Sequence, residues 1–357
     1  MCRIILLVFL LFLLLGFINK KVMRYLAVIA ILFLITKEAI RLHDRGWPTK
    51  GTGCFICDIF KKTSYGGSAI NQSELVFSEV KNFTMQASPE DLLHLSCTAG
   101  DIKIEAWDKD TISIKAEKKA RTKEDLKRIR VTVGKKEYKD KKNCIVVDDR
   151  NSFEKQQLQG KEIYGQVYYE IKVPRVLASM VIKIYAGAVK AEKFQVQKLE
   201  IQTHAANVKL EHITGDIDMN SFSGDLEAKD IAGNLKVDTK SGSIEAKDVS
   251  GDIFVSSASG SIEIEDAKGK RVNVGTLSGD IEMENVKGAI EVDSKSGDIE
   301  LKKVHAGVKA KTLSGSIEIK RASGAAGEIK AKSLSGSVEI KDFEGNIISQ
   351  GPSSGSG

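Results

Sequence analysis

Apolar and polar residues alternate with a period of two through most of the chain beyond residue 174, and small residues interrupt this alternation at regular intervals. A pair of small residues recurs nine times, in steps of 19, 18, 18, 18, 19, 18, 18 and 21 residues. The pairs are Ala186-Gly187, Ala205-Ala206, Ser223-Gly224, Ser241-Gly242, Ser259-Gly260, Ser278-Gly279, Ser296-Gly297, Ser314-Gly315 and Ser335-Gly336. Because a further glycine divides every interval from Ala205-Ala206 onward, the pattern predicts two short strands per repeat, each in an arm of about nine residues.

Each repeat carries too little apolar surface to fold alone. It buries about five aliphatic side chains worth about 2 kcal/mol each, against about 1 kcal/mol or more of backbone entropy per residue. Stacking equivalent coils about 4.8 Å apart satisfies their backbone groups and joins their interiors into one core. We therefore expect an all-β fold, a parallel β-solenoid with about 18 residues per coil.

A weaker form of the pattern precedes the repeats. Leu93, Leu95 and Cys97 lead into Ala99-Gly100-Asp101, which predicts an initial coil with Cys97 as a small buried hydrophobe. Residues 122–128 predict a short helix capped by Thr122 with Asp125. Strands are expected at residues 129–133, 144–147 and 167–173, and together these elements would form a β-rich cap over the unpaired strand edges of the solenoid.

The amino terminus has the composition of a membrane anchor. Residues 4–18 and 26–35 are apolar runs separated by a charged segment, and each is shorter than the roughly 20 residues that span a bilayer. A helical hairpin, one spanning helix and an uncleaved signal anchor all remain open, as does a translation start at Met23. Lys20, Lys21 and Arg24 favour a cytoplasmic location for this segment, which places the bulk of the chain outside the cytoplasm.

These features divide the chain into five parts. We expect a membrane anchor (1–41), a juxtamembrane linker (42–73), a cap with the first coils (74–175), the repetitive solenoid (176–350) and a flexible tail (351–357). The linker contains Cys54 and Cys57 in a C-x-x-C pair. A local disulfide, inert thiols, and a metal or redox pair remain open, although a zinc site needs two more ligands.

Several segments resemble a known family. The run Val167-Tyr168-Tyr169-Glu170-Ile171-Lys172-Val173-Pro174, followed by units such as Ser241-Gly242-Ser243-Ile244-Glu245, is similar to the bacterial putative-adhesin family of β-strand-repeat proteins. The resemblance covers roughly residues 74–349. It implies a membrane-attached or exported β-solenoid of undefined function, and it brings no catalytic motif and no cofactor.

Composition supports a repetitive β protein more than an enzyme. The 357 residues include 31 Gly, 4 Pro and only 6% aromatics, which excludes collagen-like chains and disfavours a large aromatic-lined cleft. The only G-x-S-x-G match, at residues 351–355, has no strand before it and no helix after it, so it cannot form a nucleophile elbow.

One acidic cluster could bind a ligand. Glu227, Glu245, Glu263, Glu282, Glu300, Glu318 and Glu339 occupy equivalent places and should form a column. The adjacent column holds lysines, but Glu265 and Glu284 replace them in the middle coils. Glu263, Glu265, Glu282 and Glu284 would thus form a patch for a divalent cation or a cationic partner, or else a solvated face that keeps the coils soluble.

A basic segment offers a second candidate surface. Residues 115–143 hold 13 basic and 5 acidic residues, a net charge of +8, whereas the whole chain has +6. Anionic lipid headgroups or envelope polymers are the candidate partners, and a generic solvated face is the alternative. Nucleic acid is not expected, because aromatic residues are nearly absent from this segment. The residues concerned are Lys118, Lys119, Arg121, Arg128, Arg130, Lys135 and Lys136.

The sequence thus predicts a non-enzymatic, membrane-anchored, extracytoplasmic β-solenoid that serves as an adhesin-like binding or structural module of the cell envelope. Its expected partners are the membrane and envelope polymers or another envelope protein. One alternative is a cytoplasmic, membrane-tethered scaffold that polymerises through its terminal coils. Another is a glycan-active enzyme, since some solenoid surfaces carry catalysis.

Overall fold

The computed structural model describes residues 74–138, 141–150, 163–305, 307–320, 328–342 and 346–351, which belong to one compact unit that begins at Ile70. The predicted anchor at 1–41, the linker at 42–73 with Cys54 and Cys57, and most of the tail at 351–357 lie outside the described residues. Within the described part of the chain, no helix is long and apolar enough to cross a membrane.

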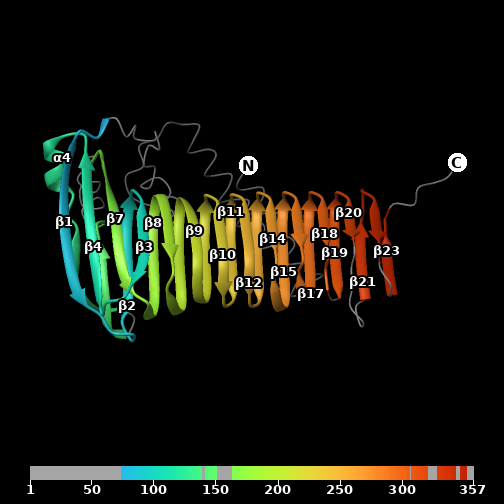
Figure 1. Ribbon diagram of the computed structural model, residues 1–357. Coiled ribbons are helices and arrows are strands. Elements are labelled where there is room, and N and C mark those ends of the chain that lie inside the picture. Colours follow the sequence, from blue (N-terminus) through green and yellow to red (C-terminus); the bar gives the residue numbers. More distant parts are fainter. Residues whose placement is uncertain are drawn as a thin grey trace, which may run out of the picture. The chain divides into compact units, whose positions relative to one another are not determined.

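The repeats form two parallel sheets whose strands follow one another side by side (Figure 1). The first sheet contains β10 (Leu226–Ala232), β12 (Ile244–Ser250), β14 (Ile262–Glu265), β16 (Ile281–Glu284), β18 (Ile299–Lys302), β20 (Ile317–Lys320) and β22 (Val338–Lys341). The second contains β11 (Leu235–Ser241), β13 (Ile253–Ser259), β15 (Lys268–Ser278), β17 (Lys287–Ser296), β19 (Val308–Ser314), β21 (Glu328–Ser333) and β23 (Asn346–Gln350). The predicted parallel β-solenoid is confirmed.

Strand register follows the spacing of the repeats. Ile244 pairs with Ile262, Ile262 with Ile281, and Ile281 with Ile299, so that each residue lies beside its equivalent in the next coil. These isoleucines are 1–2% exposed, and their neighbours two residues on are also buried. The period-two alternation therefore builds one continuous aliphatic core along the stack.

Side chains at the turns hold adjacent coils together. Asp225 Oδ1 accepts a hydrogen bond from the Ser243 amide at 2.8 Å, and Asp298 Oδ1 accepts one from the Ser316 amide at 2.7 Å. A residue with positive φ also recurs once per coil in the first sheet, within β10 and β12 at Asp230 and Asp248 and directly after β14 and β16 at Asp266 and Asn285. Asp and Asn tolerate this conformation better than most residues do, which explains why they recur at this position.

The Ser-Gly turns bring consecutive glycine backbones into contact. Gly260 has a φ of 135°, and a Cβ atom on it would lie 2.2 Å from the carbonyl oxygen of Gly242. No side chain fits there, because the distance between coils is fixed by the strand hydrogen bonds on either side. The repeating glycine is thus a requirement of the stacking.

Long strands connect the repeats to the amino-terminal part. β8 (Val176–Glu192) and β9 (Gln195–Ser223) pair in parallel, and β8 also pairs in parallel with β2 (Leu92–Ala99) and β3 (Ile102–Trp107). Cys97 pairs with Ile184, which pairs with Thr203, and Cys97 is 2% exposed. The predicted first coil with a buried Cys97 is confirmed.

Antiparallel strands end the parallel stack on this side. β4 (Thr111–Ala120) pairs antiparallel with β7 (Gly165–Pro174) and with β1 (Phe77–Gln86), while β5 (Thr132–Tyr138) pairs antiparallel with β6 (Lys141–Asp148). The helix α4 (Lys123–Arg128) lies in this region, and the Thr122 hydroxyl accepts a hydrogen bond from the Asp125 amide at 3.0 Å, as predicted. The strand expected at 129–133 begins only at Thr132, because Ile129 donates its amide to Asp125 and ends the helix.

A buried carboxylate connects three strands of the cap. Asp149, just after β6, has no exposed surface and accepts hydrogen bonds from the Tyr169 hydroxyl at 2.7 Å and the Thr98 amide at 2.8 Å. Its own amide donates to the Ser96 carbonyl at 3.1 Å. Burial raises the pKa of Asp149 to about 6, although both accepted hydrogen bonds favour the charged form.

Replacing Gly260 by Ala should destabilise the fold by about 3 kcal/mol, because the new methyl group cannot occupy the space held by the Gly242 carbonyl. Urea unfolding followed by circular dichroism measures the change. Gly275→Ala is the matched control: a Cβ on Gly275 would meet only the Asp293 carbonyl oxygen, at 3.8 Å, so this variant should be at least as stable as the parent. Equal losses in both variants would contradict the stacking argument.

Stability should fall as the pH rises from about 4 to about 6, because the Asp149 carboxyl binds its proton more tightly in the folded than in the unfolded chain. The shift from 3.8 to about 6 corresponds to about 3 kcal/mol, with the stability contribution present below pH 4 and lost above pH 6. Asp149→Asn should remove this part of the pH dependence, whereas Asp148→Asn should keep it. Urea unfolding at several pH values tests both variants. If the free energy of unfolding of Asp149→Asn still falls between pH 4 and pH 6 as in the parent, Asp149 is not the group responsible.

Candidate functional site

The predicted glutamate column exists. Glu227 pairs with Glu245, Glu245 with Glu263, and Glu263 with Glu282, and the series continues through Glu300 and Glu318 to Glu339. In the adjacent column, Lys247 pairs with Glu265, Glu265 with Glu284, and Glu284 with Lys302. The four residues of the predicted acidic patch therefore come from the neighbouring strands β14 and β16.

Lysines pair with three carboxylates of this patch. Lys247 Nζ lies 2.5 Å from Glu265, Lys302 Nζ lies 2.7 Å from Glu282, and Lys303 Nζ lies 2.6 Å from Glu284. Lys303 thereby lowers the pKa of Glu284, while the pKa of Lys302 rises because Glu282 and Glu300 both contact it. The lysines of adjacent coils thus offset most of the repulsion expected along the column.

Glu263 is the exception within the patch. Partial burial raises its pKa, and the charges of Glu245, Glu265 and Glu282 raise it further. The described residues contain no group of three or more His, Cys, Asp or Glu side chains arranged to hold a metal ion. Binding of a cation or a cationic partner at Glu263, Glu265, Glu282 and Glu284 therefore stays a prediction.

The basic segment is largely engaged within the cap. Lys118 is 2% exposed, lies 2.6 Å from Glu79 and donates to the Leu126 and Ile129 carbonyls at 3.4 and 3.3 Å. The other predicted residues lie nearer the surface, and several pair with carboxylates. These pairs are Lys119 with Glu117, Arg121 with Glu74, Arg128 with Asp125 and Lys135 with Asp91. The segment is therefore less available to anions than its sequence charge indicates.

A stack of aromatic rings lies at the turn edge of the second sheet. The Tyr185 and His204 rings are 4.6 Å apart, and the His204 and Phe222 rings are 4.8 Å apart, each pair nearly parallel. Lys240 of the next coil places its Nζ 5.0 Å from the Phe222 ring centre. Since each ring covers the face of its neighbour, this stack stabilises the coils along one edge.

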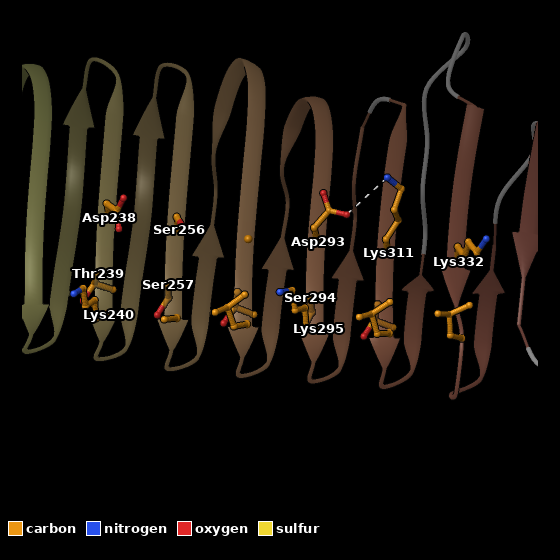
Figure 2. Close-up of a pocket in the computed structure, with 17 residues that line it drawn as sticks. Asp238, Thr239, Lys240, Ser256, Ser257, Asp293, Ser294, Lys295, Lys311 and Lys332 are labelled. Carbon is orange, nitrogen blue, oxygen red and sulfur yellow. Dashed lines mark ion pairs between the residues drawn. The ribbon is translucent and has the colours of Figure 1, made fainter. Parts of the chain in front are cut away.

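A groove of about 820 Å³ crosses the second sheet beside this edge, as Figure 2 shows. Its floor is the backbone of β11, β13, β15, β17 and β19, and two columns of outward side chains two residues apart in each strand form its walls. The column nearer the middle of the strand consists of Asp238, Ser256, Gly275, Asp293, Lys311 and Lys332. The column nearer the turn consists of Lys240, Ala258, Leu277, Lys295, Leu313 and Leu334.

The sequence prediction omitted this groove. Its signal was nevertheless present in the repeat: Gly275 occupies a strand position where other coils hold Ser, Asp or Lys, and leucines recur at a position where other coils hold Lys or Ala. Outward positions vary with little effect on the core, so a pattern analysis directed at buried residues passes over them.

Replacing Glu263 by Gln should raise the melting temperature, because it removes one charge from a site with three carboxylate neighbours. Glu300→Gln should lower it, because Glu300 contacts Lys302 at 3.0 Å and Lys320 at 3.4 Å. Each substitution should change the free energy of unfolding by about 0.5 kcal/mol, since solvent screens both sites. Thermal unfolding followed by circular dichroism at low and high salt measures the difference, which salt should reduce. A loss of stability in Glu263→Gln would show that the column is not under repulsion there.

Comparisons with known proteins address the fold family. No curated protein matches the chain in sequence. Among solved structures, a putative adhesin from Parabacteroides distasonis has 14% identity and a TM-score of 0.35, covering 76% of this chain and 97% of its own. A putative cell adhesion protein from Clostridium sporogenes has 10% identity and a TM-score of 0.22, covering 74% of this chain and 99% of its own. With TM-scores below 0.5, neither likeness supports an argument about this chain.

Comparison with models of protein families gives a match, and the match covers the repeats. The model of one family matches the chain twice, over residues 157–249 and 231–356, which together span more than half of its length. The matched segments contain the Ser-Gly turns, the glutamate column and the groove. The chain therefore belongs to the Toastrack DUF4097 family.

Proposed function

We propose that this chain is a non-enzymatic, membrane-anchored β-solenoid whose coils act outside the cytoplasm as a binding or structural module of the cell envelope. The observation that carries the proposal is the register of the outward side chains. From Glu227 to Glu339, equivalent residues pair strand by strand through seven consecutive coils, so the surface repeats the same side chains at each coil.

Such a surface suits an extended partner. A partner that follows the stack meets similar groups at each coil, so many weak contacts add up along its length. Catalysis, in contrast, needs a few groups of different chemistry held at one place. The repeated Glu and Lys columns pair with each other through contacts such as Lys247 with Glu265. They therefore suit the binding or bracing of an extended structure better than they suit catalysis.

The proposed anchor rests on the sequence of residues 4–18 and 26–35, and the proposed side of the membrane rests on Lys20, Lys21 and Arg24. A membrane anchor would confine the coils to one surface and raise their local concentration toward partners there. Envelope polymers and other envelope proteins are the partners that this placement favours.

Membrane sidedness tests the proposal. In intact cells that produce the full chain with Cys2, Cys54 and Cys57 changed to Ser, Ser256→Cys should react with a membrane-impermeant maleimide, because residue 256 is exposed on β13. External protease should also release the coils by cutting between residues 42 and 73. Cys97 and Cys144 are buried and should stay unlabelled until the protein is denatured, which provides the internal control.

Two results would contradict the proposal. Labelling of Ser256→Cys only after lysis, with the coils spared from external protease, would favour the cytoplasmic scaffold instead. Turnover of envelope glycans by the purified chain that disappears when Glu263 and Glu282 are both changed to Gln would show that the protein is an enzyme.

A further inference from the structure

Gly275 opens the groove on the second sheet without being required by the fold. It lies inside strand β15, outside the positive-φ positions, and an added Cβ would meet nothing closer than 3.8 Å. The turn glycines are different, since a Cβ on Gly260 would lie 2.2 Å from a backbone carbonyl oxygen. Glycine within a strand costs about 0.5–1 kcal/mol relative to a residue with a side chain. Glycine at this position thus deepens the groove at a cost in stability.

The leucines along the groove are also not required by the coils. Leu277, Leu313 and Leu334 are 48%, 49% and 57% exposed, and they all belong to the wall nearer the turn. Lys240 and Lys295 occupy the same position in other coils, so the backbone accepts a charged residue there. Three large apolar side chains that are exposed in one column, at a position where lysine also fits, indicate a contact surface.

Two cations of the groove form no ion pair with the described residues. Lys295 and Lys332 are exposed, and among the described residues neither forms an ion pair. Lys311 lies 3.9 Å from Asp293, a loose contact that Figure 2 marks with a dashed line. In the glutamate column, by comparison, lysines such as Lys302 contact carboxylates at 2.7–3.0 Å. The positive charges of Lys295 and Lys332 are therefore available to a ligand.

The two walls differ in chemistry at the end toward β21. Lys311 and Leu313 of β19 lie on opposite sides of the groove, and so do Lys332 of β21 and Leu334, the residue directly after that strand. One wall is thus cationic where the other is apolar. An extended peptide alternates its side chains between two sides, so acidic and apolar residues in alternation would match these walls.

We propose that this groove binds an extended peptide segment of a partner protein in which acidic and apolar side chains alternate. The acidic side chains would contact Lys311 and Lys332, the apolar ones would cover Leu313 and Leu334, and the backbone would pass over Gly275. This proposal deepens the binding role given above and rests on it. No aromatic ring is among the described residues that line the groove, which disfavours a sugar polymer, and a concave site does not fit a flat bilayer.

The test uses the purified full chain in detergent and a fluorescein-labelled peptide of alternating glutamate and leucine, with binding followed by fluorescence anisotropy. We expect saturable binding that weakens with salt. Gly275→Val should weaken it about tenfold or more by filling the groove, while its melting temperature stays the same or rises because valine favours strands. Asn273→Val is the matched control: residue 273 also faces outward on β15 but does not line this groove, so binding should be retained.

A second pair of variants tests the charges. Lys332→Gln should weaken peptide binding, whereas Lys330→Gln, two residues earlier on β21 and paired with Glu328 at 2.5 Å, should not. Absence of peptide binding, equal binding of a lysine-leucine peptide, or binding that Gly275→Val leaves intact would each overturn the proposal. So would preferential binding of an oligogalacturonate that Gly275→Val abolishes, since the occupant would then be an anionic glycan. The sidedness result in cells is independent of all these outcomes.

Discussion

The structure depends on one constraint, which is that each coil must be compatible with a copy of itself placed one strand spacing away. Parallel pairing puts Ile262 beside Ile281 and Glu263 beside Glu282, so every position meets its own equivalent above and below. For an aliphatic residue this arrangement is favourable, since like side chains pack in layers. For a charged residue it is unfavourable unless another column supplies the opposite charge, as Lys302 does for Glu282 and Glu300.

The same constraint explains which parts of the structure could be predicted from the sequence. The interior and the turns are self-matching, so they repeat in the sequence, and the alternation around Ile244 together with the Ser-Gly pairs was enough to predict the solenoid, its register and the glutamate column. The cap was harder, because strands such as β1 and β5 occur once and have no equivalent against which to compare them. Ile129 shows the difficulty: its apolar side chain fits a strand, but its amide ends helix α4.

The positions of the candidate site residues could be predicted from the sequence, but their burial and ion-pair partners could not. The sequence placed Glu263, Glu265, Glu282 and Glu284 together correctly, yet it could not show that Lys303 reaches Glu284 from the turn. Lys118 was expected on a basic surface and is instead buried, because the antiparallel pairing of β1 with β4 places Glu79 beside it and helix α4 turns the Leu126 and Ile129 carbonyls toward it. Such contacts depend on strands distant in sequence, which a local pattern does not encode.

The turn near Asp252 shows how the stack accommodates irregularity. Ser250 pairs with Lys268, 18 residues later, but Ile253 pairs with Val272, 19 residues later, so one additional residue lies between these pairs. Asp252 Oδ1 accepts hydrogen bonds from both the Lys270 amide at 2.8 Å and the Arg271 amide at 3.1 Å, and the extra backbone group is thereby satisfied. Length variation is thus absorbed at a turn, whereas a single insertion within an arm would reverse the inner and outer faces. A protein of this design can gain or lose whole coils, or change the length of its loops, while the faces of its sheets keep their orientation toward other molecules.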